Sequence, residues 1–192
     1  MFRRSWKKKD PIEDGEPREI ADPVRARERT MNRAVKLLAA KPRSVEELRT
    51  RLLERSWTNE EIVASVIETL AEYKYLDDKQ YAADLAASKL RQKPIGKRRL
   101  QQSMSMKQLD SEIVSEAIDA AYEKMPEAQL IDRAIEKRLR LKGPPETRED
   151  AKKFYDYLMR QGFDYGLIRD KIGQLGKREF NRDEGDTGDE TF

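Results

Sequence analysis

Apolar residues spaced four apart occur three times along the chain, each time followed by a short turn-like stretch. The pairs are Leu48 and Leu52, Leu100 and Met104, and Phe154 and Leu158. Residues four apart lie on one face of a helix, so each pair predicts a helix that buries one side. The pairs recur with a period of about fifty residues, which is typical of a tandem array of supersecondary units.

The residues after each pair predict a helix end followed at once by a new helix. In the third copy, Gly162 suits a left-handed position, Phe163 an apolar contact behind it, and Asp164 the N-cap of the next helix. Thr58 and Asp110 take the same capping place in the other two copies. Apolar residues then recur four and eight positions after each cap, at Ile62 and Val66, Val114 and Ile118, and Ile168 and Ile172.

A further amphipathic helix precedes the pair in each unit. Its apolar residues are Ala34, Val35, Leu37 and Leu38 in the first unit, Tyr81, Ala82, Leu85 and Ala86 in the second, and Ile131, Ala134, Ile135 and Leu139 in the third. No segment has the alternation of a strand. We therefore expect an all-α protein, an elongated tandem array of three three-helix repeats of helix-turn-helix type. The alternative is one irregular helical bundle in which the repetition is accidental.

The limits of the repeats follow from caps and helix breakers. We expect repeats over residues 30–76, 77–125 and 126–176, with a disordered arm of mixed charge over 1–29 and a disordered acidic tail over 177–192. The arm opens with a basic, aromatic cluster, Arg3–Lys9, which suits either nucleic-acid contact or a solvated tail.

Capping signals mark the starts of several helices. Capping boxes occur at Ser44-x-x-Glu47, Thr58-x-x-Glu61 and Thr147-x-x-Asp150, and Asp77 is the expected N-cap of the first helix of the second repeat. Pro94-Ile95-Gly96 and Gly143-Pro144-Pro145 end helices, and Pro126 marks the junction between the last two repeats.

Composition narrows the class of protein. Charged residues make up 40% of the chain and apolar residues 37%, and the chain contains neither cysteine nor histidine. Disulfides, Cys/His zinc sites and the commonest general base are thereby excluded. No phosphate-binding glycine loop is present. We expect a soluble, cytoplasmic protein without enzymatic activity, cofactor or metal. The carboxylate pair Asp77-Asp78 is read as a helix cap, with a metal site as the alternative.

The distribution of positive charge is more informative than the net charge of +3. Just before the anchor of the second helix stand Glu46-Glu47 in the first repeat, Lys97-Arg98-Arg99 in the second and Lys152-Lys153 in the third. Cations in a first helical turn oppose the helix dipole, so the two basic clusters predict anion sites, with tolerated surface filler as the alternative.

Other cations extend this set. Arg133, Lys137 and Arg140 predict a basic stripe on one helical face, and Lys107 joins them as a candidate contact. The predicted partner is a polyanion: a nucleic-acid backbone, an acidic protein groove, or both.

Three segments resemble the RecX family of RecA regulators. They are Tyr75-Leu76-Asp77-Asp78-x-x-Tyr81-Ala82, Gly96-x-x-Arg99-Leu100 and Arg160-Gln161-Gly162-Phe163. The resemblance covers roughly residues 30–175, and its first two segments are the more specific. It implies tandem three-helix repeats that bind in the groove of the RecA filament on DNA and inhibit its ATPase, strand-exchange and coprotease activities.

The chain departs from that family in two turns, where Gln108 and Ser56 stand in place of glycine. A residue other than glycine in a left-handed position costs about 1 kcal/mol. Either these turns have another geometry, or the first two repeats are slightly less stable than the third.

Two other classes of function remain open. The first is a largely non-specific DNA-binding protein of helix-turn-helix type, and the second is a protein scaffold without nucleic acid. The candidate recognition helices begin with acidic residues, which argues against sequence readout but allows weak DNA contact. The leading hypothesis is a regulator that binds the RecA filament as a monomer and has no membrane contact.

Overall fold

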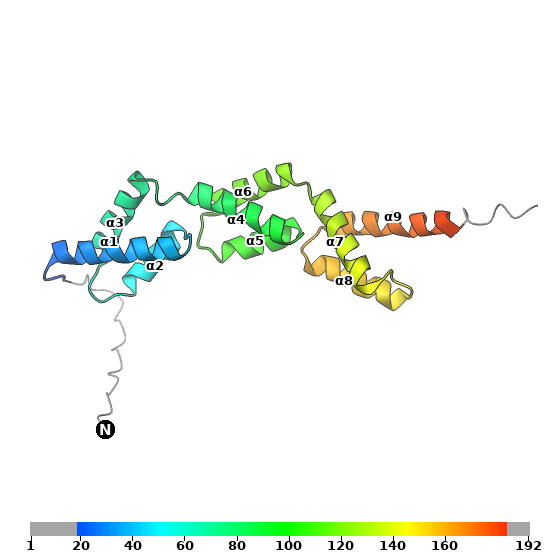
Figure 1. Ribbon diagram of the computed structural model, residues 1–192, viewed down its shortest axis with the longest axis horizontal. Helices are drawn as coiled ribbons and strands as arrows, with labels where there is room; N and C mark the ends of the chain where they lie inside the picture. Colours follow the sequence, from blue (N-terminus) through cyan, green and yellow to red (C-terminus); the bar gives the residue numbers. More distant parts are fainter. Residues whose placement is uncertain (1–18, 184–192) are drawn as a thin grey trace, which may run out of the picture. The chain divides into compact units, whose positions relative to one another are not determined.

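The computed structural model describes residues 19–183, with side chains as far as residue 174. Within that range the chain forms nine α-helices and no strand (Figure 1), which confirms the all-α fold. The helices are α1 Pro23–Ala40, α2 Val45–Leu53, α3 Glu60–Glu72, α4 Asp78–Gln92, α5 Lys97–Ser105, α6 Ser111–Lys124, α7 Glu127–Lys142, α8 Arg148–Arg160 and α9 Tyr165–Asp183. None of these helices is long and apolar enough to span a membrane.

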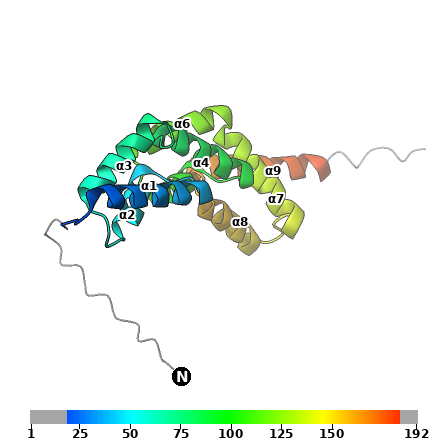
Figure 2. The same cartoon turned by 60° about the vertical axis from the view of Figure 1, so that its left-hand side comes forward.

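The chain divides into two compact units. Of the described residues, the first contains 19–41 and 48–75, and therefore α1, α3 and most of α2. In it α1 lies alongside α3, as the helices with these labels in Figures 1 and 2 show. Its core includes Leu48, Leu52, Val63 and Val66. A buried polar pair completes the packing, in which the Thr30 hydroxyl donates to the Thr58 hydroxyl at 3.0 Å.

Of the described residues, the second unit contains 42–47 and 76–183. Its helices α4, α5 and α6 lie side by side, and α7, α8 and α9 follow. One continuous apolar core runs through all six helices, from Ala82 to Ile168. The six predicted anchors are all buried, at 3% exposure or less: Leu48, Leu52, Leu100, Met104, Phe154 and Leu158.

Most predicted caps are confirmed. Asp77 accepts from the Gln80 amide at 2.9 Å, Asp110 from the Glu112 amide at 2.8 Å, and Asp164 from the Gly166 amide at 2.8 Å. Ser44 and Thr147 accept from the amides of Glu47 and Asp150. Local side-chain capping therefore starts these helices in the expected places.

The predicted cap of the third helix is wrong. Asn59, not Thr58, is the N-cap of α3, and its side chain accepts from the Ile62 amide at 3.0 Å. Thr58 is buried instead, because its hydroxyl pairs with that of Thr30. The tertiary hydrogen bond outweighs the local capping role.

Gln108 and Ser56, which stand where the family usually has glycine, adopt different backbone conformations. Gln108 has a φ of 52°, so it adopts the left-handed conformation that glycine would favour, whereas Ser56 does not have a positive φ. The second repeat therefore carries the conformational cost and the first uses another turn geometry. Gly162, with a φ of 86°, takes the left-handed position as predicted, and Phe163 is buried behind it.

The expected limits of the two arms require correction. Helix α1 begins at Pro23, well inside the expected arm, because Asp22 caps it and proline suits its first turn. Its buried residues are Ala26, Thr30 and Ala34, while Val35, expected in the core, is 51% exposed.

The last helix of the third repeat also extends further than expected. Helix α9 continues to Asp183, past the expected end at 176, because no proline interrupts residues 177–183. The rest of both arms, including Arg3–Lys9, lies outside the described residues.

Candidate anion-binding site

The start of α5 lies directly against the turn between α8 and α9. The Gly96 amide donates to the Gln161 carbonyl oxygen at 2.9 Å. A Cβ on Gly96 would stand 2.2 Å from the Gly162 carbonyl oxygen, and one on Gly162 would stand 2.5 Å from the Arg99 nitrogen. Two of the motif segments recognised in the sequence therefore meet in one backbone contact between the second and third repeats.

Lys97 is held by groups of its own chain. Its backbone amide donates to the Glu127 carboxylate at 3.0 Å, so an internal anion already occupies this helix start. Its ammonium group pairs with Asp119 at 3.1 Å and lies 5.6 Å from the centre of the Tyr122 ring. Lys97 is thus half-exposed but engaged, and the predicted anion site at the amides of α5 is not free for an external ligand.

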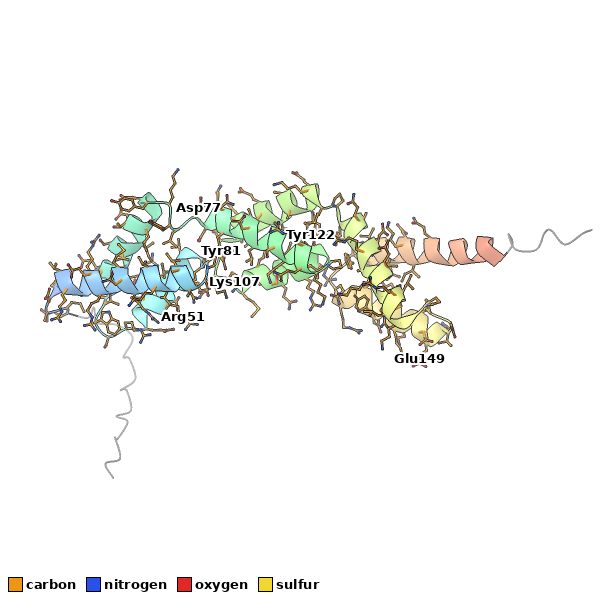
Figure 3. The ribbon with its side chains drawn as sticks, viewed as in Figure 1. Arg51, Asp77, Tyr81, Lys107, Tyr122 and Glu149 are labelled. Atoms are coloured by element: carbon orange, nitrogen blue, oxygen red, sulfur yellow. The ribbon has the colours of Figure 1, made fainter. Side chains whose placement is uncertain are left out.

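Tyr122, labelled in Figure 3, supports the same corner from α6. It is buried, and its hydroxyl donates to the Ile95 carbonyl oxygen at 2.8 Å. Burial, and to a lesser extent Glu127, raises the pKa of Tyr122 well above its ordinary value. The hydroxyl therefore stays protonated and keeps the loop before α5 in place.

The two arginines of this cluster differ. The Arg99 guanidinium is partly buried and donates to the Arg160 carbonyl oxygen, where it closes the last turn of α8. Arg98 is exposed and pairs with no residue of the described chain. Of the cluster at 97–99, Arg98 is therefore the residue best placed to reach a partner.

Lys107 lies in the turn after α5 (Figure 3) and is half-buried. Its carbonyl oxygen accepts from the Ser44 hydroxyl at 2.7 Å, and the residue takes part in a further interaction. Lys107 therefore stabilises the packing of the second unit and is less available than the exposed cations to bind a partner.

The basic stripe on α7 is exposed. Arg133, Lys137 and Arg140 are all solvent-exposed, and none of them pairs with a residue in the described part of the chain. The helix buries Leu130, Ile131, Ala134 and Ile135 on its other side. This stripe is the largest of the predicted basic groups that the structure leaves open to a partner.

In the third repeat the helix start predicted at Thr147 is confirmed, but the expectation that Lys152 and Lys153 lie in its first turn is wrong. Helix α8 begins at Arg148, so its first turn carries Glu149 and Asp150, and the two lysines stand a turn further on. The Lys153 ammonium group pairs with the Glu149 carboxylate at 2.9 Å. Glu149, at the start of α8, is labelled in Figure 3. Lys152 is exposed and pairs with no described residue. The cluster therefore does not oppose the helix dipole.

The carboxylate pair has two separate capping roles. Asp77 caps its own helix, and Asp78 accepts from the Val45 amide at 2.9 Å, at the first turn of α2. Burial raises the pKa of the Asp78 carboxyl, although the hydrogen bond from Val45 acts to lower it. No group of three or more acidic residues in the described range is placed to hold a metal.

The structure contains a second basic stripe that the sequence pattern did not predict. Arg25, Arg29, Arg33 and Lys36 share one face of α1. Arg25 and Arg29 fall within the expected arm, whereas Arg33 and Lys36 fall within the expected first repeat. Asp22 followed by Pro23 is a helix-start signal that would have joined them to α1.

Comparison with known proteins gives a consistent result. Three family models match the chain in order: the first three-helix domain of RecX over residues 31–70, the second over 77–118 and the third over 126–172.

Individual proteins agree with these models. The regulatory protein RecX of Chlorobium limicola is 33% identical over 74% of this chain and 86% of its own length. That of Prosthecochloris aestuarii is 31% identical over 77% of this chain and 93% of its own. The crystal structure of RecX from Lactobacillus salivarius superposes with a TM-score of 0.70 at 20% identity, covering 80% of this chain and 98% of that one.

Proposed function

Because the chain belongs to the RecX family of regulatory proteins, we propose that it binds the RecA filament on DNA and lowers the filament's ATPase, strand-exchange and coprotease activities. The observation that carries this proposal is the match of all three three-helix domains, in order. The whole array, and not a single repeat, is similar to proteins with a regulatory role. RecA acts on DNA inside the cell, so the proposed place of action is the cytoplasm.

We assign the contact to the exposed cations of the second unit. They are Arg98, Arg133, Lys137, Arg140 and Lys152. None of these side chains has an ionic partner in the described chain, so contact with an external anion breaks no internal pair. A surface of unpaired cations attracts a polyanion and speeds its encounter. Lys97, Arg99, Lys107 and Lys153 contribute chiefly by holding the surface in place.

The proposed mechanism requires no catalytic group. A protein that contacts neighbouring protomers of a filament restrains the movements that accompany ATP turnover. By occupying the groove, the same protein also excludes a second DNA and coprotease substrates. Both effects come from differential binding, because the regulator favours one state of the filament over the others.

The test is inhibition of RecA's DNA-dependent ATPase by an Arg133→Gln/Lys137→Gln/Arg140→Gln variant. These side chains are exposed and unpaired, so we expect an unchanged melting temperature and roughly a tenfold or greater rise in the concentration needed for half inhibition. The matched control is Arg91→Gln/Lys93→Gln/Lys124→Gln, which removes the same charge from exposed positions elsewhere. Equal inhibition by the α7 variant and the wild type would contradict the assignment of the contact surface.

A further inference from the structure

The basic face of α1, defined by Arg25, Arg29, Arg33 and Lys36, is a continuous surface of the first unit. At 3.6 residues per turn these positions fall within about 80° of the helix circumference, with successive arginines about 6 Å apart along the axis. The apolar side of α1, at Ala26 and Ala34, turns into the core. The four cations therefore form one row along the solvent side of the helix.

None of these four side chains pairs with an acidic group in the described chain. Arg25, Arg29 and Lys36 are exposed, and Arg33 is half-buried. The Arg33 Nε is enclosed and has no hydrogen-bond partner. Elsewhere in the first unit, arginines do find partners: Arg27 donates to Ser65 and Thr69, and Arg51 pairs with Glu54. Among the described residues, the row on α1 therefore has no acidic partner.

An aromatic ring lies beside this row. The Arg29 guanidinium stands 4.5 Å from the centre of the Trp57 ring, and that of Arg55, from the turn before α3, stands 5.6 Å away. Stacking on an indole holds a guanidinium flat while its N–H edges remain able to bind an oxyanion. Less rotational freedom is then lost when an anion binds.

The two basic stripes of the protein differ in this respect. On α7, the arginine that stacks on a ring is Arg138, which lies over Tyr157. Arg138 points to a different side of α7 from Arg133, Lys137 and Arg140. The α1 row therefore combines regularly spaced guanidinium groups with a stacked aromatic, whereas the α7 row has only the charges.

We propose that the basic face of α1, together with Trp57 and Arg55, binds the phosphate backbone of single-stranded DNA directly. Guanidinium groups match the geometry of phosphate oxygens with paired hydrogen bonds. A single row of cations follows one strand, and basic grooves with aromatic side chains are typical of single-strand binding. The direct contact needs no recombinase, so it goes beyond the proposed function and does not depend on it.

The test is binding of a fluorescent thirty-nucleotide oligothymidine in the absence of RecA, measured by anisotropy over a range of salt. The Arg25→Gln/Arg29→Gln/Arg33→Gln variant should bind at least tenfold more weakly. Each lost phosphate contact should flatten the slope of log K against log salt by about 0.7, so the loss of three should flatten it by about two. A second variant, Arg25→Gln/Lys36→Gln, changes only exposed side chains and should lower affinity without altering the melting temperature.

The control variant is Arg133→Gln/Lys137→Gln/Arg140→Gln, which removes equal charge from α7 and should lose much less affinity for oligothymidine than the α1 variant does. An equal loss in this control would overturn the proposal, because only net charge would then matter. Polyglutamate that displaces the oligonucleotide at equal charge concentration would point to an acidic protein partner instead. Preference for duplex DNA over oligothymidine would exclude the single-stranded assignment. Because this assay lacks RecA, its failure leaves the ATPase test of the proposed function unaffected.

Discussion

Gly96 and Gly162 lie so close together that neither position has room for a side chain. Gly162 also has a φ of 86°, which glycine adopts without strain. Around this contact, Gly96 donates to Gln161 and Arg99 donates to Arg160. The residues that suggested a family in the sequence thus have a physical role, which is to join the second repeat to the third.

Replacement of Gly96 by alanine should therefore destabilise the second unit. A Cβ 2.2 Å from the Gly162 carbonyl oxygen forces two backbone segments apart, and such overpacking costs about 1–3 kcal/mol. The control is Gly173→Ala in α9, where a Cβ meets nothing within 4 Å and helix propensity predicts a gain of up to about 1 kcal/mol. Urea unfolding measures both, and equal stability of the Gly96→Ala protein and the wild type would contradict the close contact.

Some helix starts are determined by the local sequence, and others by contacts between distant residues. Asp77, Asp110, Asp164 and Thr147 act within their own helices, so their spacing alone predicted them. Local spacing does not predict that Asn59, in place of Thr58, caps α3, or that Asp78 caps α2. Thr58 is drawn into the core by Thr30, and Asp78 caps α2 from the beginning of α4. Both depend on contacts between residues far apart in the sequence.

The role of Asp78 predicts a specific dependence of stability on pH. Burial raises the pKa of this carboxyl in the folded protein, so the folded state holds its proton more tightly than the unfolded state does. Its contribution to the free energy of unfolding is then largest below the unfolded pKa of about 3.9 and is lost as pH rises through the raised folded pKa.

An Asp78→Asn variant keeps an oxygen for the Val45 amide but cannot ionise. We expect the stability difference, wild type minus variant, to fall as pH rises above about 4 and to level off once the folded carboxyl has ionised. Urea denaturation at a series of pH values measures this difference. Asp84→Asn, at an exposed position within α4, is the control for the loss of one carboxylate from the same helix. A wild-type advantage that grows with pH would mean that the pKa is lowered, contrary to our account.

At the scale of the whole molecule, the sequence predicted the architecture better than the site. The repeat of Leu48, Leu100 and Phe154 is a property of the core, and core periodicity is visible in one chain. Which cations remain unpaired depends on acids brought near by folding: Asp119 and Glu127 engage Lys97, and Glu149 engages Lys153. Ion pairs between residues brought together by folding therefore leave fewer cations available to a partner than the spacing of charges along the sequence predicts.

In the described part of the chain, cations that folding leaves unpaired form two basic surfaces, one in each unit. One lies on α7 with Arg98 and Lys152 in the second unit, and the other lies on α1 in the first. We assign the former to the filament and the latter to single-stranded DNA. A regulator with both would bind preferentially where the two partners occur together.

The most direct test of the central claim is binding of the full chain to three targets side by side: RecA alone, single-stranded DNA alone, and the RecA filament assembled on that DNA. Surface-immobilised targets and one salt concentration keep the three affinities comparable. We predict that the assembled filament is bound at least tenfold more tightly than either component, and that the α7 variant loses most of that preference. Binding to the filament that is no tighter than binding to bare DNA would contradict the assignment of this protein as a regulator of the RecA filament.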